Sequence, residues 1–337
     1  MVKRAGNLMP RICSLENLHE AFLRAARGKC TRKAVILFRR QLDENLADMG
    51  RKLADGSFRF GQYHFFTIYD PKQRTICAAS FPERVAFHAI MRICHPVFDD
   101  FQTNDSFASR LGRGQYKALE QAKKCCRKYK WFAKMDVRKY FDSIDHNVLF
   151  CQLSRLFKDP LLLRYFSDLI LGYEVEPGRG LPIGNLTSQY FANHYLAVAD
   201  HFAKEQLRIK AMVRYMDDIL IFADNNEQLK GYVTALTKFT NEHLQLSLHE
   251  PVINKTCFGV PFLGYVVYHN RLRLNNRSRK RFVHKMASLT VDVEQGSITQ
   301  QQYAMRASCM MAFIDKAEAS PFKRQMTCRK GLYPQGL

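Results

Sequence analysis

Two adjacent carboxylates, Asp217 and Asp218, separate two strand-like runs at residues 211–215 and 219–222. Like charges held this closely disfavour each other's ionisation, and a bound divalent metal ion is the simplest compensation. Asp136, which ends another apolar run, is the best candidate for a further ligand. Such carboxylates can bridge two ions about 4 Å apart, the arrangement used for in-line phosphoryl transfer. These residue types therefore predict metal-assisted phosphoryl transfer.

Asp136 also has a structural alternative, because an acid at the end of an element can cap a helix or face solvent. That structural role is assigned to four further acids at expected element ends: Asp142, Asp145, Asp200 and Asp224. A metal site at 217 and 218 needs a second acidic position, so the prediction of catalysis depends on Asp136.

The charge of the chain indicates a polyanionic partner. Its 337 residues include 52 Lys and Arg against 31 Asp and Glu, a formal net charge of +21. The positive charge is clustered, since residues 271–285 contain seven Lys or Arg and no acid. A basic but unspecialised surface is the alternative, and the clustering argues against it. Together with phosphoryl-transfer chemistry, this predicts that the partner is nucleic acid.

Length and apolar content exclude several classes of protein. A chain of this size can bury about three quarters of its unfolded surface, and a hydrophobic fraction of 47% argues against disorder. No apolar run approaches a membrane span, and no apolar stretch follows the basic N-terminus as in a secretory signal. We therefore expect a cytoplasmic protein with no membrane partner. The ten cysteines lack zinc-like spacing and are expected to be reduced, with four inside apolar runs: Cys94, Cys151, Cys257 and Cys309.

The hydrophobic pattern predicts mixed helices and strands that position these acids. Strands are expected at 63–69, 75–78 and 131–137, as a hairpin within 211–222, and around a turn within 260–267. Helices are expected at about 15–22, 31–54, 82–93, 148–157, 191–198 and 227–243, and two more follow residue 271. The expected helix N-caps are Ser14, Asp145, Ser278 and Thr299. Glycine-containing loops are expected at 106–118 and 172–188.

The order of these features resembles that of reverse transcriptases over residues 60–268. The resemblance is carried by Arg74 in a basic turn, residues 136–141 (DVRKYF), the loop 181–193, residues 215–218 (YMDD), Lys255, and residues 262–265 (FLGY). Each motif alone is weak, whereas the set in the family's order and spacing is strong. It implies an α+β right-hand polymerase fold with fingers, a palm of antiparallel sheet plus helices, and a helical thumb. The implied parts are 1–130 (N-terminal segment and fingers), 131–145 (first part of the palm), 146–184 (connection), 185–268 (second part of the palm) and 269–337 (basic thumb).

The resemblance also implies roles for single residues. The expected metal site is Asp136, Val137, Asp217 and Asp218, holding two Mg²⁺ ions or Mn²⁺ as a substitute, and Lys255 is expected to protonate the leaving pyrophosphate. The residues expected at the incoming nucleotide are Lys72, Arg74, Phe141, Ile183, Gly184 and Gln189, with Phe141 as a steric gate against a 2′ hydroxyl. The residues expected at primer or template are Arg110, Arg113, Tyr215, Met216, Phe262, Leu263, Gly264 and Tyr265. An ordinary core position for Phe141 and a solvated turn at 72–74 are the structural alternatives.

Two positions depart from most reverse transcriptases. The loop has Ile183 before Gly184, where most members have Gln, and Gln189 after Ser188, where most have Pro. This pattern resembles the enzymes of diversity-generating retroelements, which copy a template RNA inaccurately at adenines and pass the cDNA to a target gene. The resemblance implies template RNA, a cDNA or primer strand and dNTPs as partners. It also implies a small basic helical accessory protein, the accessory variability determinant, usually a pentamer, in a bacterial, phage or archaeal host.

Other functions remain open. Within the class, the alternatives are a retron, group II intron or antiviral-defence reverse transcriptase. The intron alternative is less expected, because no maturase or endonuclease segment follows the thumb in this sequence. Outside the class, the alternatives are a catalytically silent RNA-binding module and a DNA-templated polymerase. The three carboxylates and the basic residues Lys72 and Arg74 argue against the silent module.

Overall fold

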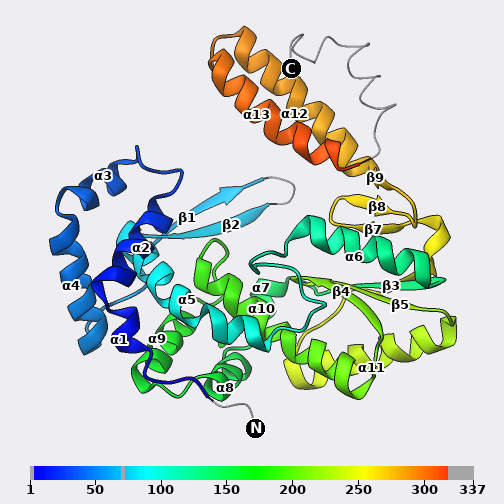
Figure 1. Ribbon diagram of the computed structural model, residues 1–337, viewed down its shortest axis with the longest axis horizontal. Coiled ribbons are helices and arrows are strands. Elements are labelled where there is room, and N and C mark those ends of the chain that lie inside the picture. Colours follow the sequence, from blue (N-terminus) through cyan, green and yellow to red (C-terminus); the bar gives the residue numbers. More distant parts are fainter. Residues whose placement is uncertain (1–3, 70–72, 318–337) are drawn as a thin grey trace.

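The computed structural model describes residues 4–69 and 73–317, which form a mixed α+β molecule in three parts (Figure 1). An N-terminal group of helices carries a two-stranded hairpin. A central part surrounds a four-stranded antiparallel sheet, and a C-terminal part combines a small three-stranded sheet with two helices. In the part of the chain described here, no helix is both long enough and apolar enough to span a bilayer.

The N-terminal part packs amphipathic helices against the long helix α5. Ser14 caps helix α2 as predicted, because its side chain accepts a hydrogen bond from the Asn17 amide. The predicted helix at 31–54 is instead two helices that break at Gln41. The elements of this part are α1 (Met9–Ile12), α2 (Leu15–Ala26), α3 (Lys33–Arg40), α4 (Leu42–Asp55), β1 (Tyr63–Ile68), β2 (Arg74–Ala79) and α5 (Phe81–Phe101).

Glu83 fastens the hairpin to helix α5. It is 2% exposed, and its carboxylate accepts hydrogen bonds from the amides of Gly61 and Gln62 at the base of β1. The same carboxylate accepts from the Ser80 amide and hydroxyl in a capping box. One buried carboxylate therefore satisfies several backbone donors and sets where the hairpin leaves the helix.

Glu83→Ala is expected to lower the free energy of unfolding by about 2–3 kcal/mol, because it removes the charged acceptor of these hydrogen bonds. Urea unfolding followed by circular dichroism measures the change. Glu120→Ala, at an exposed position of helix α6 (Gln115–Lys128), is the matched control and should change stability by less than about 0.5 kcal/mol. Equal stability of the two variants would contradict the proposed anchoring.

The central sheet has the strand order β4-β5-β3-β6, and each neighbouring pair is antiparallel. Its strands are β3 (Trp131–Asp136), β4 (Ala211–Tyr215), β5 (Asp218–Ala223) and β6 (Val252–Lys255). Alternate residues of a strand point to opposite faces. Phe132, Leu220 and Phe222 accordingly join the core beneath helix α6, whereas Met135 and Ile221 join the core on the other face. Both faces of the sheet are therefore buried over most of its length.

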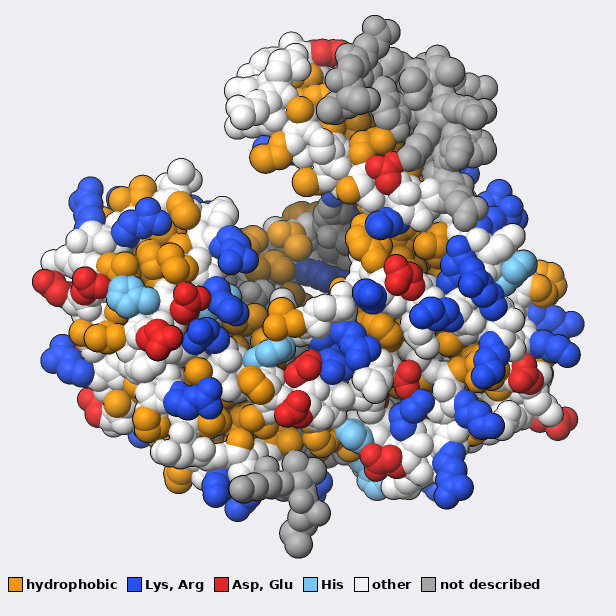
Figure 2. Space-filling view, viewed as in Figure 1, with side chains coloured by type: hydrophobic (Ala, Val, Ile, Leu, Met, Phe, Trp, Pro, Cys, Tyr) orange, Lys and Arg blue, Asp and Glu red, His pale blue; other side chains and the backbone are white. Residues whose placement is uncertain are grey.

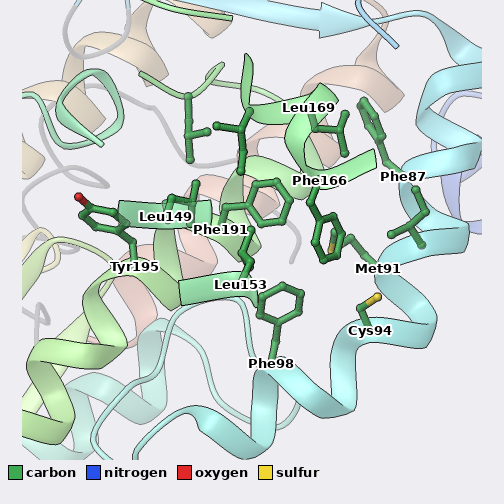
Figure 3. Close-up of a cluster of buried hydrophobic side chains, with 14 of the residues drawn as sticks. Phe87, Met91, Cys94, Phe98, Leu149, Leu153, Phe166, Leu169, Phe191 and Tyr195 are labelled. Atoms are coloured by element: carbon green, nitrogen blue, oxygen red, sulfur yellow. The ribbon is translucent and has the colours of Figure 1, made fainter. Parts of the chain in front are cut away.

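The helices on the second face form the largest core. Aromatic and aliphatic side chains from α5, α8, α9 and α10 interlock there, among them Phe98, Phe166 and Phe191 (Figure 3). Helix α9 is absent from the sequence-based prediction. The remaining elements of the central part are α7 (Tyr140–Ser143), α8 (His146–Leu156), α9 (Pro160–Leu171), α10 (Leu186–His201), η1 (Phe202–Gln206), α11 (Asn226–Leu244) and η2 (Thr256–Phe258).

In the C-terminal part, the small sheet β7-β8-β9 lies against helix α6, and two helices extend from it on the side away from the central sheet (Figure 1). Asn275, rather than the predicted Ser278, caps helix α12, because the Asn275 side chain accepts from the Ser278 amide. Thr299 caps helix α13 as predicted. The elements are β7 (Val260–Phe262), β8 (Tyr265–Val267), β9 (Leu272–Leu274), α12 (Asn276–Glu294) and α13 (Gln300–Asp315).

The cysteines of the described residues are free thiols, in agreement with the prediction of reduced cysteines. Cys94 is buried, as expected for a small apolar side chain. Cys151, Cys257 and Cys309 are exposed, so the prediction that they are small core residues is wrong. Successive residues of an apolar run point to different faces of a helix or strand, and these three thiols lie on the solvent-facing side.

Candidate catalytic centre

The paired acids lie at the turn of the β4–β5 hairpin. Tyr215 pairs with Asp218 across the hairpin, so Met216 and Asp217 form its two-residue turn. Such turns need positive φ, and Met216 has a φ of 54°. A non-glycine residue in this conformation costs free energy, so surrounding contacts must hold the turn.

Asp136 reaches the same place through the register of the central strands. It is the last residue of β3 and lies directly opposite Asp218 of β5. Opposite residues of antiparallel strands point to the same face with their Cβ atoms about 5 Å apart. The structure therefore brings Asp136, Asp217 and Asp218 to one end of the sheet, and their role as metal ligands remains a prediction.

Burial and mutual repulsion disfavour the charged forms of these acids. Burial raises the pKa of Asp217 above its ordinary value, and the neighbouring Asp136 raises it further. Burial also raises the pKa of Asp218 to about 6, although Lys134 opposes the increase. A divalent cation would offset this cost, because it stabilises the ionised carboxylates.

The raised pKa of Asp218 predicts a pH-dependent stability of the metal-free protein. Protonation of Asp218 stabilises the folded state fully below the unfolded pKa of about 4, and this contribution is lost as pH rises through about 6. Relative to Asp218→Asn, the wild type should gain on the order of 2 kcal/mol between pH 7 and pH 4.5. Urea unfolding in EDTA at both pH values measures the difference, and a pH-independent difference would contradict the raised pKa.

The carboxylates suit a hard divalent ion in their chemistry, since Mg²⁺ prefers oxygen ligands. Asp218 Oδ1 is buried and has no hydrogen-bond partner among the described residues, so one oxygen is available. The other oxygen, Oδ2, lies 3.2 Å from Lys134 Nζ. Among the residues that the structure describes, no set of three His, Cys, Asp or Glu side chains is already assembled around one point. The donors therefore fit a metal ion, and one of them is engaged by a lysine.

Arg214 supports the turn from behind. Its side chain is 0% exposed and donates hydrogen bonds to the Met216 carbonyl and to the Gln102 side chain. It also donates to the side-chain and backbone oxygens of Asn193 and to both carboxylate oxygens of Asp200. Helix α10 and the end of α5 thereby hold the carbonyl that precedes the paired acids.

The structure corrects the assignment of Asp200. Sequence analysis treats it as an ordinary acid at an element end, whereas it is fully buried in helix α10 and paired with Arg214 at 2.7 Å. Burial raises the pKa of Asp200, and the neighbouring Arg214 opposes that increase. An arginine inside the strand 211–215, where each neighbour is apolar or aromatic, is the sequence signal that could have revealed this pair.

Of the predicted nucleotide-binding residues, Arg74 on the hairpin lies near the acids, and Phe141 lies on α7. Arg74, the first residue of β2, lies close enough to lower the pKa of Asp217 against the effect of burial. Phe141 is half-buried, and its ring centroid lies 5.9 Å from that of Tyr140. The Phe141 carbonyl accepts a hydrogen bond from the Leu181 amide, so α7 holds the start of the next loop. Lys72 lies outside the described residues.

The loop at 183–184 docks onto strand β2. The Ile183 carbonyl accepts a hydrogen bond from the Cys77 amide at 2.8 Å. Gly184 has a φ of 119°, and a Cβ there would lie 2.9 Å from Ile76 Cγ2 and 3.0 Å from the Cys77 carbonyl oxygen. Only glycine fits this approach without strain. Gln189 lies exposed in the first turns of α10, so both positions that depart from most reverse transcriptases lie beside the hairpin.

The predicted primer-contact turn is held between α6 and the C-terminal helices. Phe262 and Tyr265 are buried, and the Tyr265 hydroxyl donates to the Phe313 carbonyl at 2.6 Å. Leu263 and Gly264 have φ of 48° and 87°, and the Gln115 side chain donates to the Leu263 carbonyl. The two aromatic rings therefore anchor this turn in the core. Only its backbone and Leu263 remain partly exposed.

The prediction that Arg110 contacts the template backbone is wrong. Its guanidinium donates to Asp99 Oδ1 at 2.6 Å and to the carbonyls of Thr103 and Ser106, and the side chain is 8% exposed. Arg110 therefore closes the loop internally. Arg113 is more accessible, although it donates to the backbone and side-chain oxygens of Asn104.

The expected catalytic role of Lys255 is also contradicted. Lys255 on β6 pairs with Trp131, at the end of β3 opposite to Asp136. Trp131 and Asp136 are five residue steps apart along β3, a distance of roughly 16 Å. Lys255 Nζ lies 5.5 Å from the centroid of the Trp131 ring. An acid must lie within hydrogen-bond reach of the group that it protonates, so Lys255 is too distant.

A four-stranded antiparallel sheet that brings three carboxylates to one end, with Arg74 of the hairpin near Asp217, fits the palm of a polymerase with the right-hand fold. The sequence profile described as reverse transcriptase (RNA-dependent DNA polymerase) matches residues 71–267, more than half of the chain. The chain belongs to this family. Its reverse transcriptase domain makes it an enzyme, and the family implies catalysis with divalent metal ions.

The chain matches distant relatives. It is 23% identical over 177 residues to the putative COX1/OXI3 intron 1 protein of Saccharomyces cerevisiae, covering 49% of this chain and 21% of that protein. Among solved structures, telomerase of Candida albicans in complex with a fragment of telomeric RNA superimposes with a TM-score of 0.50 and 12% identity. Telomerase of Candida tropicalis without ligand gives a TM-score of 0.50 and 11% identity. These structural likenesses support the right-hand fold.

The chain spans only part of these proteins. It covers 50% of the Candida albicans telomerase chain and 53% of the Candida tropicalis chain. In turn, the matches cover 66% and 69% of this chain. The common part is the polymerase fold.

Proposed function

We propose that this chain copies a template RNA into cDNA by two-metal phosphoryl transfer, with Mg²⁺ as the physiological ion and Mn²⁺ as a substitute. The observation that carries the proposal is the register that sets Asp136 opposite Asp218, with Asp217 in the adjoining turn. These carboxylates would hold the ions, with the Val137 backbone beside them. Ions held there would supply activation of the primer 3′ hydroxyl and stabilisation of the charge that develops on the phosphates.

The chain's own residues would orient the substrates. Arg74 and Lys72 are proposed to bind the triphosphate, since guanidinium and ammonium groups suit phosphate. Phe141 is proposed to exclude a ribose 2′ hydroxyl. The Leu263–Gly264 turn and Tyr215–Met216 are proposed to support the primer strand. We also propose that the chain divides into fingers, palm and thumb at the boundaries given in the sequence analysis.

A basic hollow against the hairpin supports template binding. A cavity of about 390 Å³ lies where Lys29, Arg32, Arg84 and His88 face the hairpin and the start of α10. Burial and then the neighbouring Arg84 lower the pKa of His88 to about 4. The exposed face is also visibly hollowed between the N-terminal part and the C-terminal helices (Figure 2). Positive charge concentrated in a hollow favours a single-stranded polyanion.

A primer-extension assay tests the proposed function. DNA product is expected with an RNA template, dNTPs and Mg²⁺, and EDTA should abolish it. Replacement of dNTPs by NTPs should reduce the product strongly. Equal extension on RNA and DNA templates would favour a DNA-templated polymerase. RNA binding without any product would favour a catalytically silent module.

The biological role has two candidates. The similarity to a protein named for an intron favours a group II intron-like reverse transcriptase. Ile183 and Gln189 favour the second candidate, an error-prone enzyme of a diversity-generating retroelement that feeds cDNA into a target gene. That second candidate includes a small basic helical accessory protein as partner and a cytoplasmic location in a bacterial, phage or archaeal host. Retron and antiviral-defence enzymes remain further alternatives.

Ile183→Gln tests the second candidate. An amide at this position can hydrogen-bond the nascent base pair or template, whereas the isoleucine side chain cannot. The variant is therefore expected to lower misincorporation opposite template adenines several-fold, with overall synthesis within about threefold of wild type. Sequencing of the cDNA measures both quantities. Ile183→Leu is the control, because it changes shape without adding an amide. Unchanged errors at adenines in the Gln variant would contradict this role.

A further inference from the structure

Lys134 points onto the face of the central sheet that carries two of the catalytic carboxylates. It lies two residues before Asp136 on β3, and side chains two residues apart share a face. Lys134 pairs with Leu220, so Asp218 is its diagonal neighbour on β5. The register of the sheet therefore builds the contact between Lys134 and Asp218.

The contact engages half of the Asp218 carboxylate. Lys134 Nζ lies 3.2 Å from Oδ2, and the side chains of Lys134 and Asp218 are 26% and 19% exposed. Oδ1 is buried and has no partner in the described part of the chain. A carboxylate tied through one oxygen has a defined orientation, and its other oxygen, Oδ1, is left without a hydrogen-bond partner among the residues described.

The Lys134 ammonium also lowers the net negative charge around the carboxylates. It faces Asp217 and Asp218 closely enough to stabilise their ionised forms, and Arg74 contributes a second positive charge near Asp217. A positive charge among carboxylates repels a divalent ion and offsets part of the negative potential that attracts it. An incoming triphosphate brings negative charge of its own, which restores that attraction.

We propose that Lys134 is a positioning residue of the catalytic centre, which holds Asp218 in one orientation and lowers the affinity of the nucleotide-free centre for divalent ions. Uptake of ions is thereby coupled to arrival of the nucleotide. The proposal deepens the proposed function, on which it rests for the identity of the substrate. It requires no activity to be tested, because ion binding can be measured directly.

The test is a titration of the full chain with Mn²⁺, followed by electron paramagnetic resonance, with and without a dNTP. Lys134→Met should bind Mn²⁺ about tenfold more tightly than wild type without nucleotide, since a repelling charge is removed. The enhancement of Mn²⁺ affinity by dNTP should also be smaller in this variant. Lys134→Arg, which keeps the charge, should stay close to wild type. Unchanged or weaker Mn²⁺ binding by Lys134→Met would overturn the proposal.

Lys238→Met is the control for loss of a lysine charge elsewhere. Lys238 lies on helix α11, is 72% exposed and pairs only loosely with Glu242 at 3.9 Å. This variant should bind Mn²⁺ like wild type. An equal gain in Mn²⁺ affinity in Lys238→Met would show a general charge effect and overturn a specific role for Lys134.

Steady-state primer extension gives the second measurement. Lys134→Met is expected to lower kcat about tenfold or more, with the KM for dNTP within about threefold of wild type. A change confined to KM would overturn a positioning role. If no protein extends a primer, wild type included, the proposed function fails. The Mn²⁺ titration still decides the role of Lys134 in that case.

Discussion

Asp217→Asn is expected to reduce RNA-templated primer extension to background, a loss of at least about a thousandfold in kcat. Asp217 occupies the tip of the β4–β5 turn, next to the opposed pair of Asp136 and Asp218. The neutral amide is nearly the same size as the carboxylate but cannot balance the charge of a bound ion. The substitution therefore removes chemistry while it keeps the shape of the turn.

The stability of this variant separates loss of chemistry from loss of fold. Burial raises the pKa of Asp217, so its charged form destabilises the metal-free folded state at neutral pH. Asp217→Asn should therefore be as stable as wild type, or more stable, in urea with EDTA. Asp224→Asn, at an exposed acid just after β5, is the control and should keep near wild-type activity. Substantial extension by Asp217→Asn would contradict the assignment of the centre.

Arg214→Gln is expected to destabilise the protein by about 3–5 kcal/mol, because it leaves the buried Asp200 carboxylate without its cation. The hydrogen bonds to the Met216 carbonyl, to the Gln102 side chain and to the two oxygens of Asn193 are lost as well. Met216 has positive φ, and its turn is expected to relax once its carbonyl is released. Activity should therefore fall further than the folded fraction alone explains.

Urea unfolding and primer extension at a temperature where the variant is folded measure these two effects. Arg40→Gln, on the exposed side of helix α3, is the control and should change stability by less than about 0.5 kcal/mol. Combining Arg214→Gln with Asp200→Asn should recover part of the lost stability, because no unpaired charge then remains buried. If Arg214→Gln alone is as stable as wild type, the buried Arg214–Asp200 pair contributes little to the free energy of unfolding.

The acidic motif was predictable because its parts are local. Adjacent acids between two strand-like runs specify a hairpin turn, and an acid at the end of another apolar strand specifies a sheet edge. Side chains of β3 and β5 alternate between the two faces of the sheet. Few pairing registers therefore place Phe132 in one core and Met135 and Ile221 in the other. The α+β class and most element positions follow from the same periodicities. Helix α9 is absent from the prediction, because its apolar residues are not distinguished from those of the preceding helix.

The errors concern residues whose partners are distant in the sequence. Arg110 resembles a loop cation, but Asp99 and two carbonyls enclose it. Lys255 has the spacing expected of a catalytic lysine, but the β3–β6 register places it beside Trp131. Composition and spacing do not specify the register in which two strands pair, and the register sets which residues lie side by side. That information comes from the pairing of whole strands.

The chemistry available to this protein follows from its residues alone: three carboxylates in a reverse transcriptase pattern, on a chain with a large excess of positive charge. Which other side chains act on those carboxylates depends on the packing of the fold. Arg214 lies behind the turn because α10 packs under the sheet and presents Asp200 and Asn193 to it. Lys134 reaches Asp218 because two strands pair in one register. Charges in a folded protein interact through space, and only the packing of distant segments sets those distances.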